Sequence, residues 1–161
     1  MPMYVVAKVD DIPPGQRRIV TVEGRSIGVF NVGGDFYAIR NQCPHEGGPL
    51  CEGVVSGLVS SKVPGEYDYV RRGEIVRCPW HQWEFDIRSG QSWFDPAKTR
   101  VATYETTIET TIETTIETPA VTNRSATTAE DDLDAAGYQR GPYAAETYRV
   151  EVDQRLVVLH L

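Results

Sequence analysis

The chain has 161 residues, of which 40% are hydrophobic, and its 23 acidic and 16 basic side chains give a formal net charge of −7. This composition is typical of a globular protein, and the acidic balance disfavours nucleic acid as a partner, because a phosphate-binding face needs clustered lysine and arginine. No apolar run approaches the roughly 20 residues that a membrane-spanning helix requires, and residues 1–10 lack the features of a secretory signal. We therefore expect a cytoplasmic location and no membrane span.

The first forty residues predict a series of short antiparallel strands. The expected strands cover residues 4–6, 17–22, 27–32 and 36–39, which are rich in β-branched and aromatic side chains. Glu23–Gly24 and Gly33–Gly34 provide the turns between them.

Two segments break this pattern. Residues 41–53 read NQCPHEGGPLCEG and residues 78–83 read CPWHQW, with little periodicity and a high density of Gly, Pro, Cys, His and Trp. Such segments are typical of loops with a fixed chemical role. Further strands are expected at residues 54–59, 67–70, 75–77, 84–87 and 101–105.

The segment that starts at Thr106 repeats the motif TTIE three times in succession. Threonine is a poor helix former, and a repeat of four residues also fits a strand. We interpret residues 106–142 as a low-complexity, weakly ordered insertion within one domain of residues 1–161. Residues 147–152 and 156–161 are expected to form a closing hairpin.

Cys43-x-His45 in the first loop and Cys78-x-x-His81 in the second are candidate metal ligands. Two Cys and two His are the ligand set of a Rieske [2Fe–2S] centre, in which one iron has two thiolates and the other has two imidazoles. The same residues could bind zinc tetrahedrally, although Cys-x-His pairs are unusual in zinc sites. A third interpretation is that all four are surface residues that bind no metal.

The neighbouring residues favour the cluster. Pro44 and Pro79 follow the two cysteines and stiffen the loops, and Gly47–Gly48 lets backbone N–H groups approach sulfur without an intervening Cβ. The third cysteine, Cys51, has no partner left and is expected to be a small buried apolar residue. Unpaired thiols also indicate a reducing compartment.

The motifs CPHEGGPL from Cys43 and CPWHQWEFD from Cys78 resemble those of the Rieske [2Fe–2S] ferredoxins and of the Rieske domains of ring-hydroxylating oxygenases. The resemblance covers residues 3–104 and 145–161. It implies a small all-β antiparallel sandwich or barrel in which a subdomain of two loops, residues 41–53 and 78–83, holds one [2Fe–2S] cluster per chain. The ligands that it implies are Cys43, His45, Cys78 and His81.

The resemblance also implies a non-catalytic electron carrier that works with a reductase and a terminal oxygenase or similar partner. An oxygenase site needs two further histidines and a carboxylate on iron, but the chain has three histidines in all, and the third, His160, lies in a terminal strand. The separation of the two loops by residues 46–77 and the segment 106–142 depart from compact Rieske ferredoxins. An accessory subunit resembling the small subunit of nitrite reductase, and a structural zinc module, are the alternatives.

High-potential Rieske proteins carry a loop disulfide and hydroxyl donors to the cluster sulfurs. This chain has Trp80 where the second cysteine of that disulfide would lie, and Trp83 and Phe85 where the hydroxyl donors would lie. We therefore expect a reduction potential near the lower end of the roughly −150 to +300 mV range of Rieske centres.

Overall fold

The computed structural model describes the backbone of residues 1–115 and 150–161, and the side chains of residues 1–111 and 154–161. Two compact units are present: Met1–Thr111 with Gln154–Leu161 form the first, and Ile112–Asp153 form the second. The first unit contains both predicted loops. In the described ranges no helix has the length and apolar character needed to cross a membrane.

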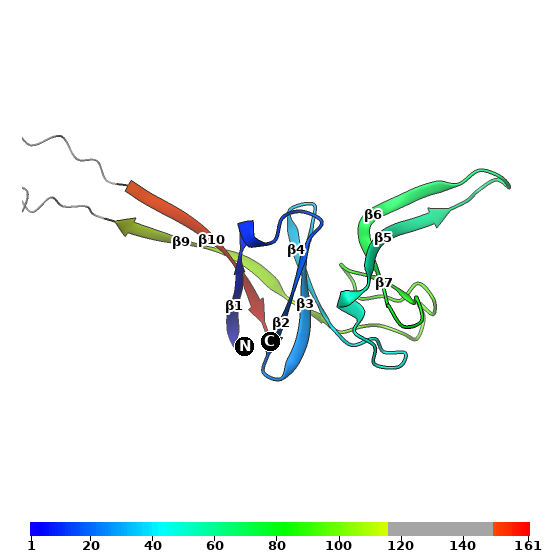
Figure 1. Cartoon of the computed structure of the whole chain (residues 1–161), viewed down its shortest axis with the longest axis horizontal. Helices are drawn as coiled ribbons and strands as arrows, with labels where there is room; N and C mark the ends of the chain where they lie inside the picture. Colours follow the sequence, from blue (N-terminus) through cyan, green and yellow to red (C-terminus); the bar gives the residue numbers. More distant parts are fainter. Residues whose placement is uncertain (116–149) are drawn as a thin grey trace, which may run out of the picture. The chain divides into compact units, whose positions relative to one another are not determined.

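Three antiparallel sheets make up the described chain (Figure 1). The first sheet has the strand order β2 (Arg17–Val22), β3 (Arg25–Val32), β4 (Asp35–Arg40), β8 (Thr103–Tyr104). The second has the order β1 (Met3–Lys8), β10 (Val150–His160), β9 (Thr106–Thr115). The third has the order β5 (Val54–Ser60), β6 (Asp68–Arg77), β7 (Glu84–Asp86). Two short 3₁₀ turns, η1 (Val9–Asp11) and η2 (Leu50–Glu52), complete the elements. The predicted all-β antiparallel fold is confirmed.

Strands β3 and β4 are buried on both faces. Side chains on the two faces of a strand alternate, and here Ile27 and Val29 of β3 face a core shared with β1 and β10. Phe30 and Val32 face the opposite way, into a core shared with the two loops and β6. The loops are therefore anchored on a strand pair whose other face is held by a second core.

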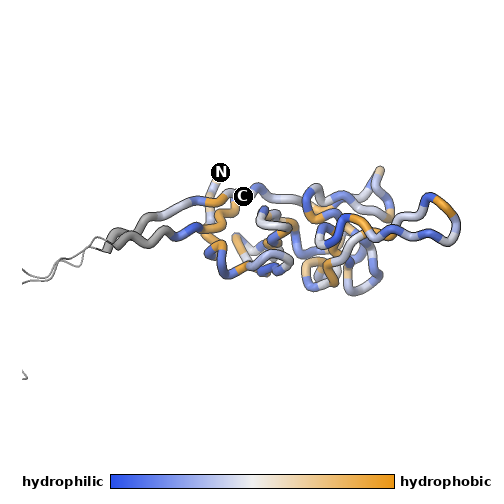
Figure 2. Tube along the Cα trace, turned by 90° about the horizontal axis from the view of Figure 1, so that it is seen from above, coloured by the Kyte–Doolittle hydropathy of each residue, from blue (hydrophilic) through white to orange (hydrophobic). Residues whose placement is uncertain are grey.

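The hairpin β5–β6 extends beyond the rest of the first unit (Figure 1), and hydrophobic as well as hydrophilic residues lie at its far end (Figure 2). Its register shifts between Ser56 and Leu58, where β6 bulges from Arg71 to Glu74. Arg71 and Gly73 have left-handed φ values of 53° and 78° at this bulge. The expected pair of strands at 67–70 and 75–77 is therefore one bulged strand.

Two expectations for the end of the chain are wrong. Residues Thr106–Thr115, expected to be weakly ordered, form strand β9, whereas residues 116–142 of the expected insertion lie outside the described residues. The predicted closing hairpin is one continuous strand, β10, that lies between β1 and β9. Val157 and Leu159 on β10 are fully buried, which explains why this strand belongs to the centre of its sheet.

Candidate metal centre

The first loop is closed by two backbone hydrogen bonds at Cys43. The Cys43 N–H donates to the carbonyl of Gly48 at 2.8 Å, and the Gly47 N–H donates to the carbonyl of Cys43 at 2.8 Å. Gly47 has a φ of 79°, a left-handed conformation that lets the chain reverse within the loop.

The second loop repeats this geometry at the same spacing from its cysteine. The Cys78 N–H donates to the carbonyl of Trp83 at 2.8 Å, and the Gln82 N–H donates to the carbonyl of Cys78 at 2.9 Å. Gln82 has a φ of 63°, so it occupies the position that Gly47 has in the first loop. Two segments with different sequences thus form the same turn around a cysteine.

The two loops pack on each other reciprocally. The residue two positions after each cysteine contacts the residue five positions after the other cysteine. The His45 ring stacks on Trp83 with centroids 4.2 Å apart and an interplanar angle of 12°, and Trp80 lies so close to Gly48 that a Cβ there would be 2.8 Å from the Trp80 ring. Gly48 is therefore required for space rather than for backbone freedom.

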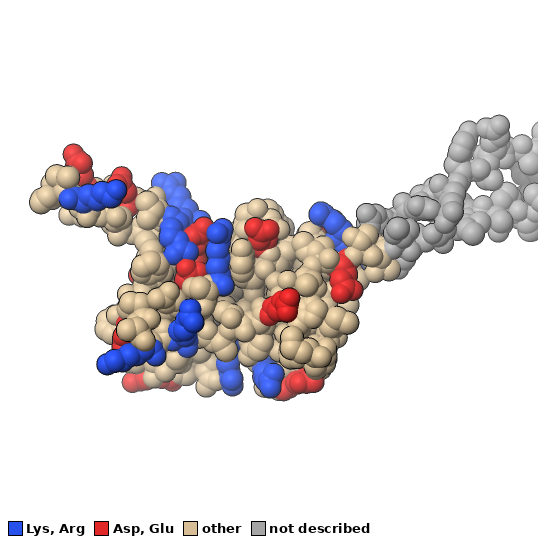
Figure 3. Space-filling view, turned by 180° about the vertical axis from the view of Figure 1, so that it is seen from behind, with Lys and Arg blue, Asp and Glu red and all other residues tan. Residues whose placement is uncertain are grey.

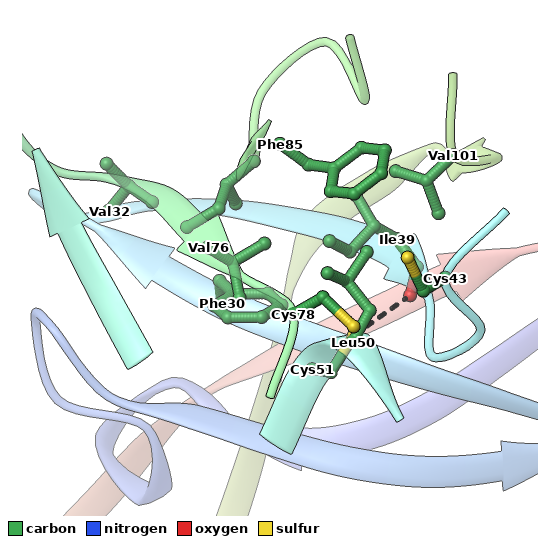
Figure 4. Close-up of a cluster of buried hydrophobic side chains, with 11 residues drawn as sticks. Phe30, Val32, Ile39, Cys43, Leu50, Cys51, Val76, Cys78, Phe85 and Val101 are labelled. Carbon is green, nitrogen blue, oxygen red and sulfur yellow. Dashed lines mark hydrogen bonds between the residues drawn. The ribbon is translucent and has the colours of Figure 1, made fainter. Parts of the chain in front are cut away.

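Cys43 and Cys78 lie side by side and are 2% and 1% exposed. Figure 4 shows both within the buried cluster that also contains Leu50, Val76 and Phe85. Burial raises the pKa of the Cys43 thiol and the Cys78 sulfur raises it further, whereas backbone N–H groups of His45 and Glu46 donate to the Cys43 sulfur and lower its pKa.

The two histidines also lie next to each other. The ring centroids of His45 and His81 are 4.7 Å apart in an edge-to-face arrangement. His45 Nδ1 is buried and has no hydrogen-bond partner, whereas the His81 side chain is 43% exposed and its Nε2 lies 3.6 Å from a carboxylate oxygen of Glu46. The fold thus brings together all four residues predicted as ligands.

These features fit a [2Fe–2S] cluster. A buried ring nitrogen without a partner is costly unless something outside the chain bonds to it, and His45 Nδ1 is such an atom. A Cβ on Gly48 would lie 3.2 Å from Cys78 Sγ, so the glycine leaves room beside this buried sulfur. Among the described residues no three His, Cys, Asp or Glu side chains converge on a single metal position. A Rieske centre does not need such a group, because each of its two irons is bound by one pair of side chains.

Cys51 is fully buried and unpaired, as predicted for a small apolar residue. Its Sγ lies 3.8 Å from the carbonyl oxygen of Ile39 (Figure 4), and a Cβ on Gly28 would lie 2.5 Å from the same sulfur. Burial raises the pKa of the Cys51 thiol to about 12. The structure therefore keeps this cysteine protonated, within the first loop but outside the Cys43–His45 motif.

Sequence reasoning missed a polar network at the base of the β5–β6 hairpin. Arg71 contacts Glu74 at 2.6 Å and Asp86 at 2.5 Å, and Arg88 contacts Glu74 at 3.1 Å. Basic and acidic side chains adjoin at this position in Figure 3. The sequence shows only two adjacent arginines before a glycine at this point, and this pattern does not identify an ionic network.

Comparison with known proteins matches residues 2–105 to the family model of the Rieske [2Fe-2S] domain. The chain is 32% identical over 83 residues to the biphenyl dioxygenase ferredoxin subunit of Pseudomonas sp. (strain KKS102), a match that spans 52% of this chain and only 62% of that protein. It is 30% identical over 98 residues to the ferredoxin component of naphthalene 1,2-dioxygenase/salicylate 5-hydroxylase systems of Ralstonia sp, which spans 61% of this chain and 79% of the relative.

Solved structures show the same fold. The ferredoxin of carbazole 1,9a-dioxygenase from Nocardioides aromaticivorans IC177 superposes with a TM-score of 0.53 at 26% identity, over 68% of this chain and 91% of that one. The Sphingomonas yanoikuyae B1 ferredoxin gives a TM-score of 0.51 at 27% identity, over 67% and 91% of the two chains. Together with the paired loops, these likenesses show that the chain belongs to the Rieske [2Fe–2S] domain family, whose cofactor is a [2Fe–2S] cluster.

Proposed function

We propose that the chain carries single electrons through one [2Fe–2S] cluster, with Cys43 and Cys78 bound to one iron and His45 and His81 bound to the other. The observation that carries this proposal is the pairing of like ligands by two loops of equal geometry, thiol beside thiol and imidazole beside imidazole. When bound, the cluster supplies a one-electron couple with a potential above that of an all-cysteine cluster.

The chain itself prepares the sulfur pair. Burial opposes ionisation of Cys43, so two adjacent thiolates in this pocket need positive charge close by, which iron ions would provide. The N–H groups of His45 and Glu46 donate to the Cys43 sulfur and disperse its negative charge. Trp80 and the Cys78 sulfur both lie beside Gly48, where a side chain would meet them.

We further propose that the redox partners are a reductase and a terminal oxygenase or a similar protein. The curated relatives are named as ferredoxin components of dioxygenase systems. If His45 and His81 hold the cluster, only His160 remains, and a 2-His-1-carboxylate oxygenase centre cannot be built from the chain alone. The net charge of −7 would favour a basic docking surface on the partner.

We place the protein in the cytoplasm, a proposal supported by three free cysteines and no disulfide among the described side chains. The two other functions considered from the sequence, a nitrite reductase-like small subunit and a zinc module, gain no specific support from the site. The low reduction potential stays a prediction. It is expected because Trp83 and Phe85 offer no hydroxyl to the cluster. A redox titration checks it, and a midpoint near the upper end of the Rieske range would contradict it.

Single-residue replacement tests the ligand assignment. Cys43→Ser, His45→Ala, Cys78→Ser and His81→Ala should each abolish the cluster, measured as iron and acid-labile sulfide in the purified chain. Cys51→Ala and His160→Ala are matched controls, because they remove the same side-chain types outside the two ligand motifs, and both should retain the cluster. A ligand variant with full iron and sulfide content would remove that residue from the site.

A further inference from the structure

Three aromatic rings form a column that begins at one candidate ligand. His45 stacks on Trp83 with centroids 4.2 Å apart, and Trp83 stacks in turn on Phe94 with centroids 4.4 Å apart and an interplanar angle of 28°. Phe94 is 69% exposed, so the column runs from the two loops to the surface.

The backbone fixes Trp83 in this column. Its carbonyl accepts the hydrogen bond from the Cys78 N–H, and it follows directly after Gln82, whose left-handed φ of 63° reverses the chain. Trp83 also packs against the core that contains Cys43 and Cys78. The indole is thus placed by the same turn that places the second cysteine.

Phe94 is fixed at the other end of the column. Its N–H donates to the hydroxyl of Ser92 at 3.1 Å, and Ser92 is fully buried. The adjacent Trp93 N–H donates to the carbonyl of Glu84 at 2.8 Å. An exposed phenyl ring held in this way covers the outer face of Trp83.

The two histidines are therefore not equivalent. His45 is half-buried and one face of its ring is covered by Trp83. Among the described residues, His81 makes its ring contact edge-to-face with His45 itself, and the His81 side chain is 43% exposed.

We propose that Trp83 is a positioning residue that fixes the plane of the His45 ring and, together with Phe94, covers it, so that His81 is the edge at which electrons are exchanged. This inference rests on the proposed function, because it assumes that both histidines bind the cluster. Electron tunnelling weakens steeply with separation, so the exposed ring offers a partner the closer approach.

Chemical labelling of the holoprotein tests the cover over His45. Diethyl pyrocarbonate modifies accessible imidazole nitrogens, and peptide mass spectrometry reads each histidine separately. His81 should be modified several times faster than His45 in the unaltered protein. Phe94→Leu and Trp83→Leu should raise the rate at His45 several-fold, whereas Trp93→Leu, which removes an exposed indole outside the two loops, should leave it unchanged.

Pulsed EPR of the reduced holoprotein tests the positioning role, because each bound ring nitrogen gives its own coupling. Trp83→Leu should shift one of the two nitrogen couplings, Trp83→Phe should restore it, and Trp93→Leu should shift neither. Phe94→Leu keeps the test available if Trp83→Leu does not fold, because Phe94 is mostly exposed.

Equal labelling of both histidines in the unaltered protein, or unchanged couplings in Trp83→Leu, would overturn the inference while leaving the cluster in place. Loss of the proposed function would look different, since the unaltered reduced protein would then show no cluster signal and no nitrogen coupling.

Discussion

At Gln82 the backbone has a φ of 63°, a conformation that costs a side-chain-bearing residue roughly 1–2 kcal/mol. Glycine adopts it freely, as Gly47 does in the equivalent position of the first loop. The strain at Gln82 is therefore local, and the hydrogen bonds at Cys78 hold it in place.

Gln82→Gly should stabilise the holoprotein by about 0.5–1 kcal/mol, because relief of the strain exceeds the extra entropy of glycine in the unfolded chain. The measurement is the temperature at which cluster absorbance is lost at a fixed scan rate, with an expected rise of roughly 1–4 °C. Gln82→Ala keeps the strain, and its temperature should not rise. A lower temperature for Gln82→Gly would show that the glutamine side chain stabilises the loop.

Gly48 tests the reciprocal packing of the two loops. Gly48→Ala should lower the cluster content, because its Cβ would lie 2.8 Å from the Trp80 ring and 3.2 Å from Cys78 Sγ. The double variant Gly48→Ala/Trp80→Ala should recover part of the iron, since it removes the nearer clash. Equal iron in Gly48→Ala and the unaltered protein would show that the loops are not packed this closely.

Cys51 predicts a pH dependence of stability. Its pKa is raised from an ordinary value of 9.0 to about 12, so the folded state prefers the neutral thiol. The resulting stabilisation is complete below about pH 9 and is lost as the pH rises towards 12, at about 1.4 kcal/mol per pH unit.

The comparison of unaltered protein with Cys51→Ala at pH 8 and pH 10.5 isolates this group, because other titrating residues are common to both. The unaltered protein should lose more thermal stability between the two pH values than the variant, by roughly 2 kcal/mol. Parallel loss in both proteins would mean that Cys51 is not buried as a neutral thiol.

Among the elements, the β5–β6 hairpin depends on the ionic network at its base. Arg71 bridges Glu74 and Asp86, and Asp86 is only 6% exposed. Asp86 also accepts hydrogen bonds from the N–H groups of Arg88 and Ser89 through its other oxygen. The network therefore ties the bulge of β6 to the turn after β7.

Arg71→Ala should destabilise the protein by about 1–3 kcal/mol, because it leaves the carboxylate of Asp86 buried without its cation. Arg18→Ala is the matched control: its 3.6 Å pair with Asp11 is half exposed on both sides, and its loss should cost less than about 0.5 kcal/mol. Thermal unfolding of both variants gives the comparison. Similar small losses would show that the network does not fix the hairpin.

The elements also show where sequence patterns were sufficient. Runs rich in β-branched and aromatic residues predicted β2 with its observed bounds and most of β3 and β4, because strand propensity can be read from the local sequence. The bulge in β6 depends on Arg71, which adopts a left-handed conformation without being glycine, and nothing local predicts that. The continuous strand β10 depends on pairing with β1, a contact between the two ends of the sequence.

The candidate site followed from the sequence for a similar reason. Cys43, His45, Cys78 and His81 are of the residue types that form a Rieske ligand set, so the sequence alone predicts that they lie in pairs. The aromatic column could not be predicted in this way, since the contact of Trp83 with His45 arises only when the two loops pack on each other. The sequence thus predicts residues whose role depends on their chemical type, but it does not predict residues whose role depends on how the loops pack.

At the scale of the whole molecule, the two cores of the described fold have different roles. Strands β3 and β4 are held by one core on the side of β1 and β10, and they support the two loops on the other. The loops present one covered and one exposed histidine. The expected single domain of residues 1–161 stays a prediction, as does the role of the segment that follows Thr115.

The decisive experiment is EPR spectroscopy of the dithionite-reduced chain with its histidines labelled with ¹⁵N, combined with iron and sulfide analysis. If Cys43, His45, Cys78 and His81 hold a [2Fe–2S] cluster, the chain should contain about two irons and two sulfides, and two nitrogen couplings should change with the isotope. A signal without nitrogen couplings, or a protein with zinc and no sulfide, would contradict this assignment.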